Sequence, residues 1–256
     1  MAREGRRNRI VRILVTNDDG IRAPGLLALC DVLLSLGHKV SVIAPSRDQS
    51  GRSQAVSIQT PVRAHRDFVL PGLDEAFAVE GTPADCVRIH AGLLDELPEL
   101  VMSGINHGAN LGADVFRSGT VGAAREAVLA GLPAVALSAL SEVPSPGVLR
   151  CHVPEAAYLA IASPGFIINV NFPVLPNLIR VIAPLSTNGY RDDVAAHEVE
   201  DGVYDVSMHR TLAPEDAEIT DLRAAFMGYV SVSRLPVRDP AVAPSLAVSS
   251  AVGRRG

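Results

Sequence analysis

Two adjacent carboxylates, Asp18 and Asp19, are the residues of this chain best suited to chemistry. They follow an apolar run, 11–16, that predicts a buried β-strand, and Gly20 comes directly after them. Inside a strand, neighbouring side chains point to opposite faces, but at a turn that glycine permits, both carboxylates can converge. Two carboxylates held close together in a crevice repel each other unless a cation lies between them. Oxygen ligands of this kind predict Mg²⁺ or Mn²⁺ rather than zinc.

A purely structural role is the alternative, because Asp-Asp-Gly also suits an Asx turn that caps the next helix. Two other loops favour the metal site. The loop 44–51, rich in hydroxyl groups, follows a second strand and contains Ser50, and the loop 103–112 follows a later strand and contains Asn106. Their neutral oxygens can complete the coordination of a hard cation, with waters in the remaining positions. The predicted ligands of one divalent cation are Asp18, Asp19, Ser50 and Asn106.

A segment of small and hydroxyl residues, Ser118-Gly119-Thr120, opens a stretch with helical character that extends to residue 130. Backbone N–H groups at the start of a helix, together with the positive end of its dipole, bind phosphate well. Ordinary N-capping by Ser118 is the alternative. Beside a divalent cation, such a site predicts hydrolysis of phosphate monoesters, because the cation neutralises the dianion and lowers the pKa of a bound water.

Three neighbouring residues complete the candidate site. Asn17 is expected to orient the loop or the substrate, and Arg117 is a candidate substrate contact. His107 is a candidate proton donor, although a lone histidine in a loop is more often solvated and passive. Direct attack by water is favoured over attack by a carboxylate, since both aspartates are assigned to the metal, but the sequence leaves the choice open. The candidate catalytic residues are Asp18, Asp19 and Asn106, and the candidate phosphate contacts are Asn17, Ser50, Asn106, Ser118, Gly119 and Thr120.

The segments that carry these loops alternate between strand and helix patterns. A helix over 24–36 has leucines at helical spacing and Gly37 as its C-cap, and Pro83 suits the first turn of a helix that runs to about residue 94. This alternation predicts an α/β fold with a mostly parallel sheet and helices on both faces, and such sheets bind ligands at the carboxyl ends of their strands. Strands are predicted at 11–16, 39–44, 76–80, 99–103, 133–138 and 166–171, and further strands at 180–183 and 228–233.

Beyond about residue 140 the pattern loosens, and residues 188–227 are polar and irregular. Charged side chains away from the strand ends, such as Glu126, are expected on solvated surfaces. The predicted parts are a flexible N-terminal extension at 1–10, a catalytic core at 11–185, a smaller irregular extension containing β-strands at 186–235 that returns to the core, and a tail at 236–256.

Composition excludes several classes of function. The 256 residues, 48% hydrophobic and 20% charged, are enough for one large core. A net charge of −5 excludes a chain-wide basic surface for duplex nucleic acid, and an aromatic content of 4% argues against stacking of single-stranded bases. Three cysteines without a C-x-x-C pair predict buried thiols in a reducing cytoplasm. The longest apolar stretches, 127–141 and 156–174, each predict a helix followed by a strand, so we expect no membrane span.

Six motifs occur in order along the first half of the chain. They are Asn17–Gly20 with Ala23–Gly25, Ala44-Pro45 with Ser50-Gly51, Gly81–Val87, Ser103–Asn106, Asn110–Gly112 and Ser118–Val121. In this order they resemble the stationary-phase survival protein SurE family. The resemblance extends from about Arg12 to Ser138 and reappears at 169–173 and 228–233. The chain departs from the family pattern in its N-terminal extension, between 141 and 166, and from Ser233 onward.

The resemblance implies a Rossmann-like, three-layer αβα fold and a divalent metal on the four residues named above. It implies hydrolysis of nucleoside 5′- and 3′-monophosphates, and in some members of short polyphosphate. It also implies a homodimer or homotetramer formed through exchanged C-terminal segments, and the departures after Ser233 bear on that exchange.

Other functions fit the sequence less well. A nucleotide-sugar glycosyltransferase, suggested by the helix-to-strand joint at 37–43, needs a second doubly wound domain, and too few residues follow 140. Phosphatases with an aspartyl nucleophile have Asp-x-Asp after the first strand, and no G-x-G-x-x-G supports a dinucleotide dehydrogenase. A non-catalytic nucleotide-binding or regulatory protein of the same fold is the remaining alternative, which the presence of all four predicted metal ligands disfavours.

Overall fold

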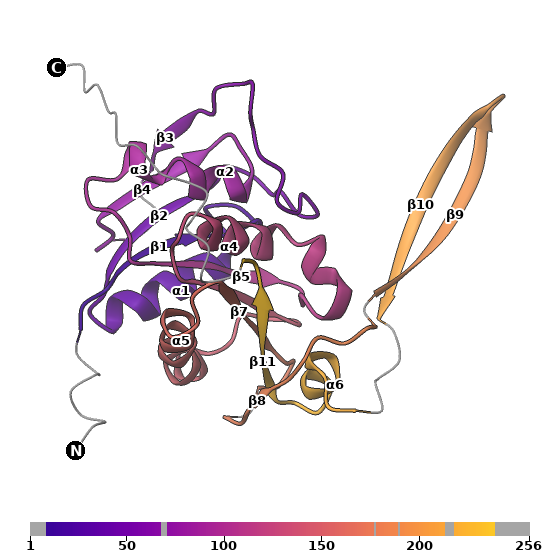
Figure 1. Cartoon of the computed structure of the whole chain (residues 1–256). Coiled ribbons are helices and arrows are strands. Elements are labelled where there is room, and N and C mark those ends of the chain that lie inside the picture. Colours follow the sequence, from indigo (N-terminus) through magenta and orange to yellow (C-terminus); the bar gives the residue numbers. More distant parts are fainter. Residues whose placement is uncertain (1–8, 68–70, 177, 189, 213–217, 239–256) are drawn as a thin grey trace.

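A nine-stranded sheet runs through the centre of the structure, a computed structural model of the chain (Figure 1). In the order in which they pair, its strands are β3 (Ala64–Arg66), β4 (Glu75–Val79), β2 (Lys39–Pro45), β1 (Arg12–Thr16), β5 (Leu100–His107), β6 (Ala134–Ala139), β7 (Phe166–Phe172), β11 (Val230–Pro236) and β8 (Arg180–Ile182). The six strands from β4 to β7 are parallel to one another. Strand β3 is antiparallel to β4, β11 is antiparallel to β7, and β8 is parallel to β11.

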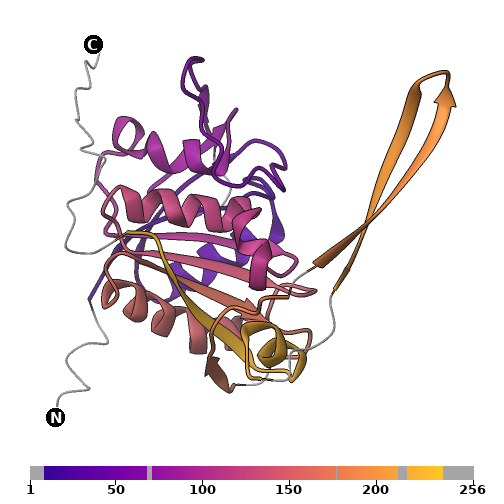
Figure 2. The same cartoon turned by 45° about the vertical axis from the view of Figure 1, so that its right-hand side comes forward.

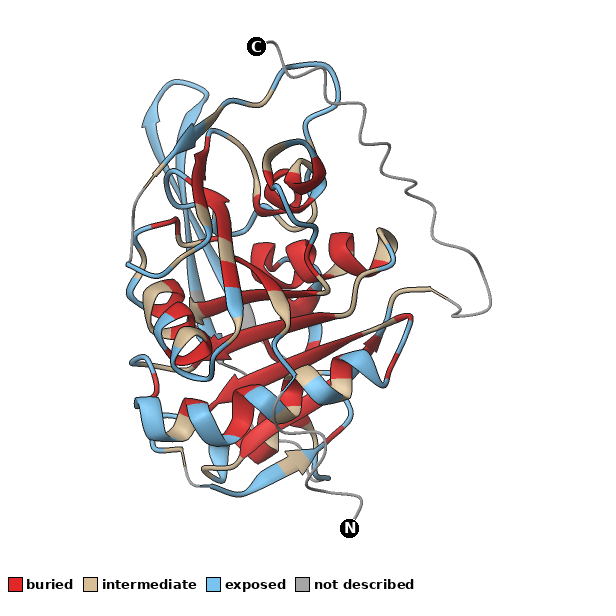
Figure 3. Ribbon diagram, turned by 90° about the vertical axis from the view of Figure 1, so that its left-hand side faces the viewer, coloured by how far each residue is buried: buried red, intermediate tan, exposed pale blue. Residues whose placement is uncertain are grey.

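Helices cover both faces of this sheet, because its strands are apolar on both sides. On β1, Ile13 and Val15 face one layer and Leu14 faces the other, as the two-residue period of a strand requires. The sheet and the helices of both layers carry many buried residues (Figure 3), and these form one hydrophobic cluster on each side of the sheet, which confirms the predicted three-layer α/β fold. One layer holds α1 (Pro24–Ser35) and α5 (Pro146–Ile161), and the other holds α2 (Pro83–Arg88), α3 (His90–Leu93) and α4 (Gly119–Leu129), with the short 3₁₀ helix η1 (Gly112–Phe116) before α4.

The connections leave β1 and β5 in opposite directions along the sheet. The chain passes from β1 through α1 to β2 on one side, while β5 lies on the other side of β1 and continues through α4 to β6. The strand order therefore reverses at the carboxyl ends of β1 and β5, and open α/β sheets bind ligands at such a point. Asp18 and Asp19 follow β1 directly, and Asn106 lies near the end of β5.

Local signals set where the helices begin and how they pack. Pro24 occupies the first turn of α1, and α2 starts with a capping box. The helix predicted for 83–94 is divided into α2 and α3 at Ile89. Gly25 allows a close approach, since a Cβ there would lie 1.9 Å from the carbonyl oxygen of Ile105. Helix α1 therefore packs directly on the backbone of β5, next to the candidate site.

The C-terminal extension contains β-strands as predicted, but residues 190–212 are regular where an irregular segment was expected. In place of an irregular segment, the chain forms a long antiparallel hairpin of β9 (Tyr190–Glu200) and β10 (Val203–Leu212), which projects from the core in Figure 1 and Figure 2. Its described side chains are exposed on both faces, so the sequence lacks the alternation that marks a half-buried strand. Asp201-Gly202 at its turn was the available signal, because Asp-Gly favours tight hairpins. Helix α6 (Asp221–Phe226) then leads back to β11.

The structure describes residues 9–67, 71–176, 178–188, 190–212 and 218–238. The N-terminal extension predicted for 1–10 and the tail predicted for 236–256 lie almost entirely outside these residues. The division into a core at 11–185 and an extension at 186–235 stays a prediction, and β11 of that extension belongs to the central sheet. Within the described part of the chain, no helix combines the length and the apolar character needed to cross a membrane.

Two of the three cysteines are buried as predicted, and the third is not. Cys30 and Cys86 lie in opposite layers of the core, and burial raises the pKa of the Cys30 thiol to about 12. Cys151 is exposed, because it lies on the outer side of α5, whose inner side carries Leu149 and Val153. The prediction of three buried thiols was therefore wrong for Cys151.

Candidate metal and phosphate site

The turn after β1 is held by a side chain of its own. Asn17 is fully buried, and its amide donates to the carbonyl of Gly20 at 2.9 Å and accepts from the N–H of Gly20 at 3.2 Å. Gly20 has a φ of 106°, a left-handed value that glycine tolerates. Asn17 therefore orients the loop, which is one of the two roles expected for it, and a contact with substrate stays a prediction.

Hydrogen bonds from two backbone N–H groups connect the aspartates to neighbouring loops. The carbonyl of Asp18 accepts from the N–H of Gln49 at 2.7 Å, and a carboxylate oxygen of Asp19 accepts from the N–H of His107 at 3.1 Å. Each of these partners is next to a predicted metal ligand in the chain. The loops after β1 and β2 and the end of β5 therefore meet, and together they carry all four predicted metal ligands, Asp18, Asp19, Ser50 and Asn106.

The start of α4 packs against Asp18. A Cβ on Gly119 would lie 2.8 Å from both the Cβ and a carboxylate oxygen of Asp18, so only glycine fits there. The hydroxyl of Thr120 donates to the other carboxylate oxygen. The hydroxyl of Ser118 accepts from the N–H of Val121 at 3.1 Å, which makes it the N-cap of α4. Phosphate binding by Ser118, Gly119 and Thr120 stays a prediction. The N–H of Ser118 donates to the carbonyl of Asp114 at 3.1 Å, and the backbone of Thr120 bonds to Asp18, so this binding would depend on the N–H of Gly119.

Burial raises the pKa of both carboxyl groups, and nearby negative charge adds to the shift. Asp18 is 3% exposed, and loss of hydration raises its pKa, although hydrogen bonds from Thr120 oppose the shift. The pKa of Asp19 is raised to about 6, first by burial and then by the charge of Asp18. The negative charge of Asp48 acts on both in the same direction. A bound cation would stabilise the two ionised carboxylates, so this pair fits a metal.

Asp48 is a residue of this region that the sequence analysis missed. Its carboxylate accepts from the N–H of Ser50 at 2.7 Å and from the hydroxyl of Ser50 at 2.6 Å, and these bonds lower the pKa of Asp48. Because the Ser50 hydroxyl gives its proton to Asp48, the lone pairs of its oxygen are available to a cation. The Asp-x-Ser spacing, which is typical of an Asx turn, was the signal for this arrangement.

Asn106 is half-buried near the end of β5. Its amide nitrogen donates to the carbonyl of Gly108 at 2.8 Å, which leaves the amide oxygen as the atom able to ligate a metal. The side chain of His107 is exposed, and its Nδ1 lies 3.1 Å from the carbonyl oxygen of Ser141. Since the bond to Asp19 comes from the backbone of His107, proton donation by the ring stays a prediction.

The loop that carries Ser50 is fastened to helices α2 and α4. A Cβ on Gly122 would lie 2.2 Å from a carbonyl oxygen of this loop, so loop and helix meet backbone to backbone. Glu126, which was expected on a solvated surface, is instead buried, and it accepts from Gln54 at 2.7 Å and from Arg88 at 3.1 Å. The expectation failed because the loop that covers this face of α4 comes from a distant part of the sequence.

A buried polar network supports the loop after β5 from behind. The carbonyl of Asn110 accepts from the side chains of Asn169 and Asn171 at 2.9 and 3.0 Å. Asp221, fully buried at the start of α6, accepts from the N–H of Gly112 at 2.9 Å. These partners are between 59 and 109 residues apart in the chain, so no local pattern indicated their role.

The predicted metal ligands offer oxygen atoms only. Among the described residues, no cluster of three or more His, Cys, Asp or Glu side chains is placed to hold a metal. A metal at this edge would therefore depend on neutral oxygens and water in addition to Asp18 and Asp19. Hard cations such as Mg²⁺ and Mn²⁺ accept such a set, and they commonly keep several waters.

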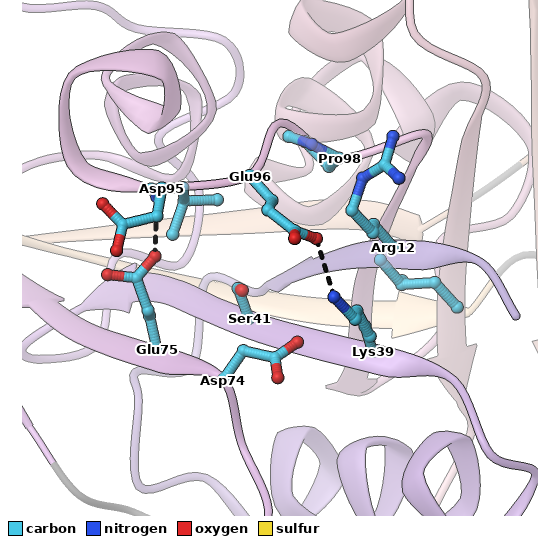
Figure 4. A pocket seen from close by; sticks show the side chains of 10 residues that line it. Arg12, Lys39, Ser41, Asp74, Glu75, Asp95, Glu96 and Pro98 are labelled. Carbon is cyan, nitrogen blue, oxygen red and sulfur yellow. Dashed lines mark hydrogen bonds and ion pairs between the residues drawn. The ribbon is translucent and has the colours of Figure 1, made fainter.

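A separate cavity lies at the opposite edge of the sheet (Figure 4). About 230 Å³ in volume, it is formed at the amino ends of β1 and β2 by Arg12 and Lys39 together with acidic residues. Its polar groups bond to one another: Lys39 lies 2.9 Å from Glu96, and Glu75 accepts from the N–H of Asp95 at 2.9 Å. Because the aspartates follow the carboxyl end of β1, this cavity is distinct from the candidate site.

Known proteins resemble this chain over most of its length. The family model described as Survival protein SurE matches residues 13–192. A 5′-nucleotidase SurE of Synechococcus sp. (strain WH7803) is 41% identical over 181 residues, which cover 68% of this chain and 66% of the relative. A 5′-nucleotidase SurE of Gloeobacter violaceus is 37% identical over 242 residues, which cover 88% of this chain and 89% of the relative. The crystal structure of a SurE protein from Aquifex aeolicus matches with a TM-score of 0.74 and 30% identity, over 89% of this chain and 94% of that chain.

Proposed function

Because this chain belongs to the survival protein SurE family, we propose that it is a metal-dependent phosphatase of nucleoside 5′-monophosphates. Nucleoside 3′-monophosphates and short polyphosphate are further substrates within the same proposal. One observation supports the proposal most directly. Hydrogen bonds connect the turn of the two aspartates to the segments that carry Ser50 and Asn106, and the N-terminus of α4 packs against this turn. Oxygen ligands for a hard cation thus lie beside N–H groups suited to an anion, as hydrolysis of a phosphate ester requires.

We infer that one divalent cation per subunit, Mg²⁺ or Mn²⁺, binds the ligands predicted above. The raised pKa of Asp18 and Asp19 supports this inference, because a cation would stabilise the ionised carboxylates that burial, and secondarily nearby negative charge, disfavour. The chemistry that such a cation supplies is neutralisation of phosphate charge and a lower pKa for water. The chain itself orients the ligands, since Thr120 holds one carboxylate and the N–H of His107 holds the other.

The N-terminus of α4 is the part of the chain that we assign to the phosphate group. The hydroxyl groups of Ser118 and Thr120 are engaged in the N-cap and with Asp18, and their backbone N–H groups bond to Asp114 and Asp18, so the N–H of Gly119 is the donor that we assign to a phosphate oxygen. Asp18 and Asp19 are both assigned to the metal, so neither is assigned as the nucleophile. Direct attack by water is therefore favoured. The water oxygen forms the new P–O bond, the ester oxygen leaves with the electron pair of the broken P–O bond, and the proton that the water loses is balanced by protonation of the leaving oxygen.

Hydrolysis assays test this proposal. The protein is incubated with p-nitrophenyl phosphate and with a panel of nucleoside 5′- and 3′-monophosphates, in Mg²⁺ or Mn²⁺ and again after chelation. We expect release of inorganic phosphate that stops on chelation and resumes when the metal is restored. Binding of nucleoside monophosphates without phosphate release in any metal would instead indicate a non-catalytic nucleotide-binding protein.

We also propose assembly into a homodimer or homotetramer through the hairpin. Val194 and Met208 pair across β9 and β10 and are 64% and 68% exposed, and Val206 is exposed on the same face. Apolar side chains that are exposed together are typical of a surface that another chain covers. Light scattering after size-exclusion chromatography should give the mass of a dimer or tetramer, and a monomer at every concentration would contradict the proposal. We also propose that the protein is cytoplasmic, as expected from its sequence.

A further inference from the structure

Arg117 is a cationic residue at the edge of the candidate phosphate site. It is the C-cap of η1 and directly precedes Ser118, the N-cap of α4. Its guanidinium group lies 3.3 Å from a carboxylate oxygen of Asp192 on β9 and 3.8 Å from one of Asp114. The side chain of Arg117 is 61% exposed, so it can rotate without moving the backbone. This one residue therefore joins η1, the start of α4 and the base of the hairpin.

The candidate site is rich in negative charge. The three carboxylates of Asp18, Asp19 and Asp48, together with a phosphate dianion, outweigh one divalent cation. Asp18 and Asp19 accept hydrogen bonds from a hydroxyl group and from backbone N–H groups, which are uncharged donors. A cationic side chain beside the phosphate would therefore strengthen its binding, and guanidinium groups match phosphate with two parallel hydrogen bonds. Arg117 directly precedes Ser118 in the chain, two residues before the N–H of Gly119 that we assign to the phosphate.

We propose that Arg117 is a phosphate contact that Asp192 holds away from the site until substrate binds. Before binding, the carboxylates of Asp192 and Asp114 keep the guanidinium group at the base of the hairpin. On binding, the phosphate dianion takes this group from Asp192. The inference rests on the proposed function, since it concerns the phosphate of the same substrate. It also gives the hairpin an influence on substrate affinity, because Asp192 belongs to β9.

The exchange is favourable because the ion pair that breaks is weak. Exposed ion pairs shift an equilibrium by at most about fivefold, since water and salt screen them. A phosphate dianion carries more charge than a carboxylate, and the interaction is screened less beside a buried group such as Asp18.

Variants of both partners test the exchange. The KM for adenosine 5′-monophosphate and the inhibition constant of inorganic phosphate are measured for the wild-type protein, Arg117→Gln, Asp192→Asn and the double variant. We expect Arg117→Gln to raise both constants about tenfold and to change kcat less than about threefold. Asp192→Asn releases the guanidinium group, so it should lower both constants about twofold to threefold. In the double variant the effect of Asp192→Asn should vanish, because no arginine is left to release.

Arg66→Gln is the matched control. Arg66 is 56% exposed and lies 3.4 Å from Glu75 in a comparable ion pair on β3, so this variant should leave both constants unchanged. Constants for Arg117→Gln within about twofold of the wild type would overturn the proposal. An equal effect of Asp192→Asn with and without Arg117 would overturn it as well.

Failure of the proposed function gives a different result. A wild-type protein that hydrolyses no nucleotide would refute the phosphatase activity without deciding the role of Arg117. The dissociation constant of inorganic phosphate for the metal-loaded protein, measured by calorimetry, would then make the same comparison among the same variants.

Discussion

The carboxyl edge of the sheet and the hairpin are stabilised in opposite ways. At the sheet edge, Asp18 is buried and bonded to Thr120 and Gln49, which come from two other segments of the chain. In the hairpin, β9 and β10 pair with each other, and Val206 and Met208 are exposed. Polar groups are thus buried in one region while apolar groups face solvent in the other. Burial therefore does not follow the polarity of the side chains in these two regions.

The largest expected difference between the two regions is the loss of kcat/KM when one aspartate carboxylate is replaced. Asp18→Asn keeps the size of the side chain but removes a predicted metal ligand, so kcat/KM should fall on the order of 10³-fold. The same change at Asp193, on exposed β9, should leave kcat/KM unchanged. Both are measured with a nucleoside monophosphate at saturating metal. Near wild-type activity in Asp18→Asn would show that Asp18 is not a metal ligand of the active site.

Truncation of an aromatic side chain compares the stability of the two regions. Phe172 is fully buried in β7, so Phe172→Ala should reduce the free energy of unfolding by about 3–5 kcal/mol. Tyr204 is exposed on β10, and Tyr204→Ala should change it by less than about 0.5 kcal/mol. Urea denaturation of both variants at low protein concentration provides the measurement. Equal losses would mean that the hairpin belongs to the cooperative core.

Gly119 tests how closely α4 is fitted to the candidate site. The new Cβ of Gly119→Ala would lie 2.8 Å from the Asp18 side chain, so Asp18 must shift. We expect a loss in kcat/KM of about 10- to 100-fold, since displacements near 1 Å can cost that much. Gly92→Ala is the control, because a Cβ there has no heavy atom within 4 Å. Equal activity of the two variants would show that α4 tolerates displacement.

The smallest expected effect is a pH dependence of stabilisation by metal. The pKa of Asp19 in the folded protein, about 6, is above the usual value, so the metal-free protein takes up a proton as pH falls through 6. This protonation stabilises the metal-free fold at low pH and competes with the metal. Between pH 8 and pH 5, the rise in Tm caused by Mg²⁺ or Mn²⁺ should therefore shrink by about 3–6 °C. A metal-induced rise in Tm that is constant over this range would contradict the shift at Asp19.

The parts of this protein that were predictable depend on short stretches of sequence. The strand predicted at 11–16 and the helix predicted at 24–36 correspond to β1 and α1, because buried strands and helix caps leave local signals. The hairpin left a weaker one, since exposure on both faces removes the alternation of apolar and polar residues and only its Asp-Gly turn remains. Glu126 and Asp221 left none, because their partners are remote in sequence.

By itself the sequence determined the alternation of strands and helices, the kinship with one protein family, and the pair of carboxylates after the first strand. Only the tertiary structure decided that Gly119 packs on Asp18 and that Thr120, 102 positions away, donates a hydrogen bond to it. The physical reason is the separation along the sequence over which each kind of interaction acts. Spacing and caps act within a few residues, whereas strand order and register bring distant loops to one edge of a sheet.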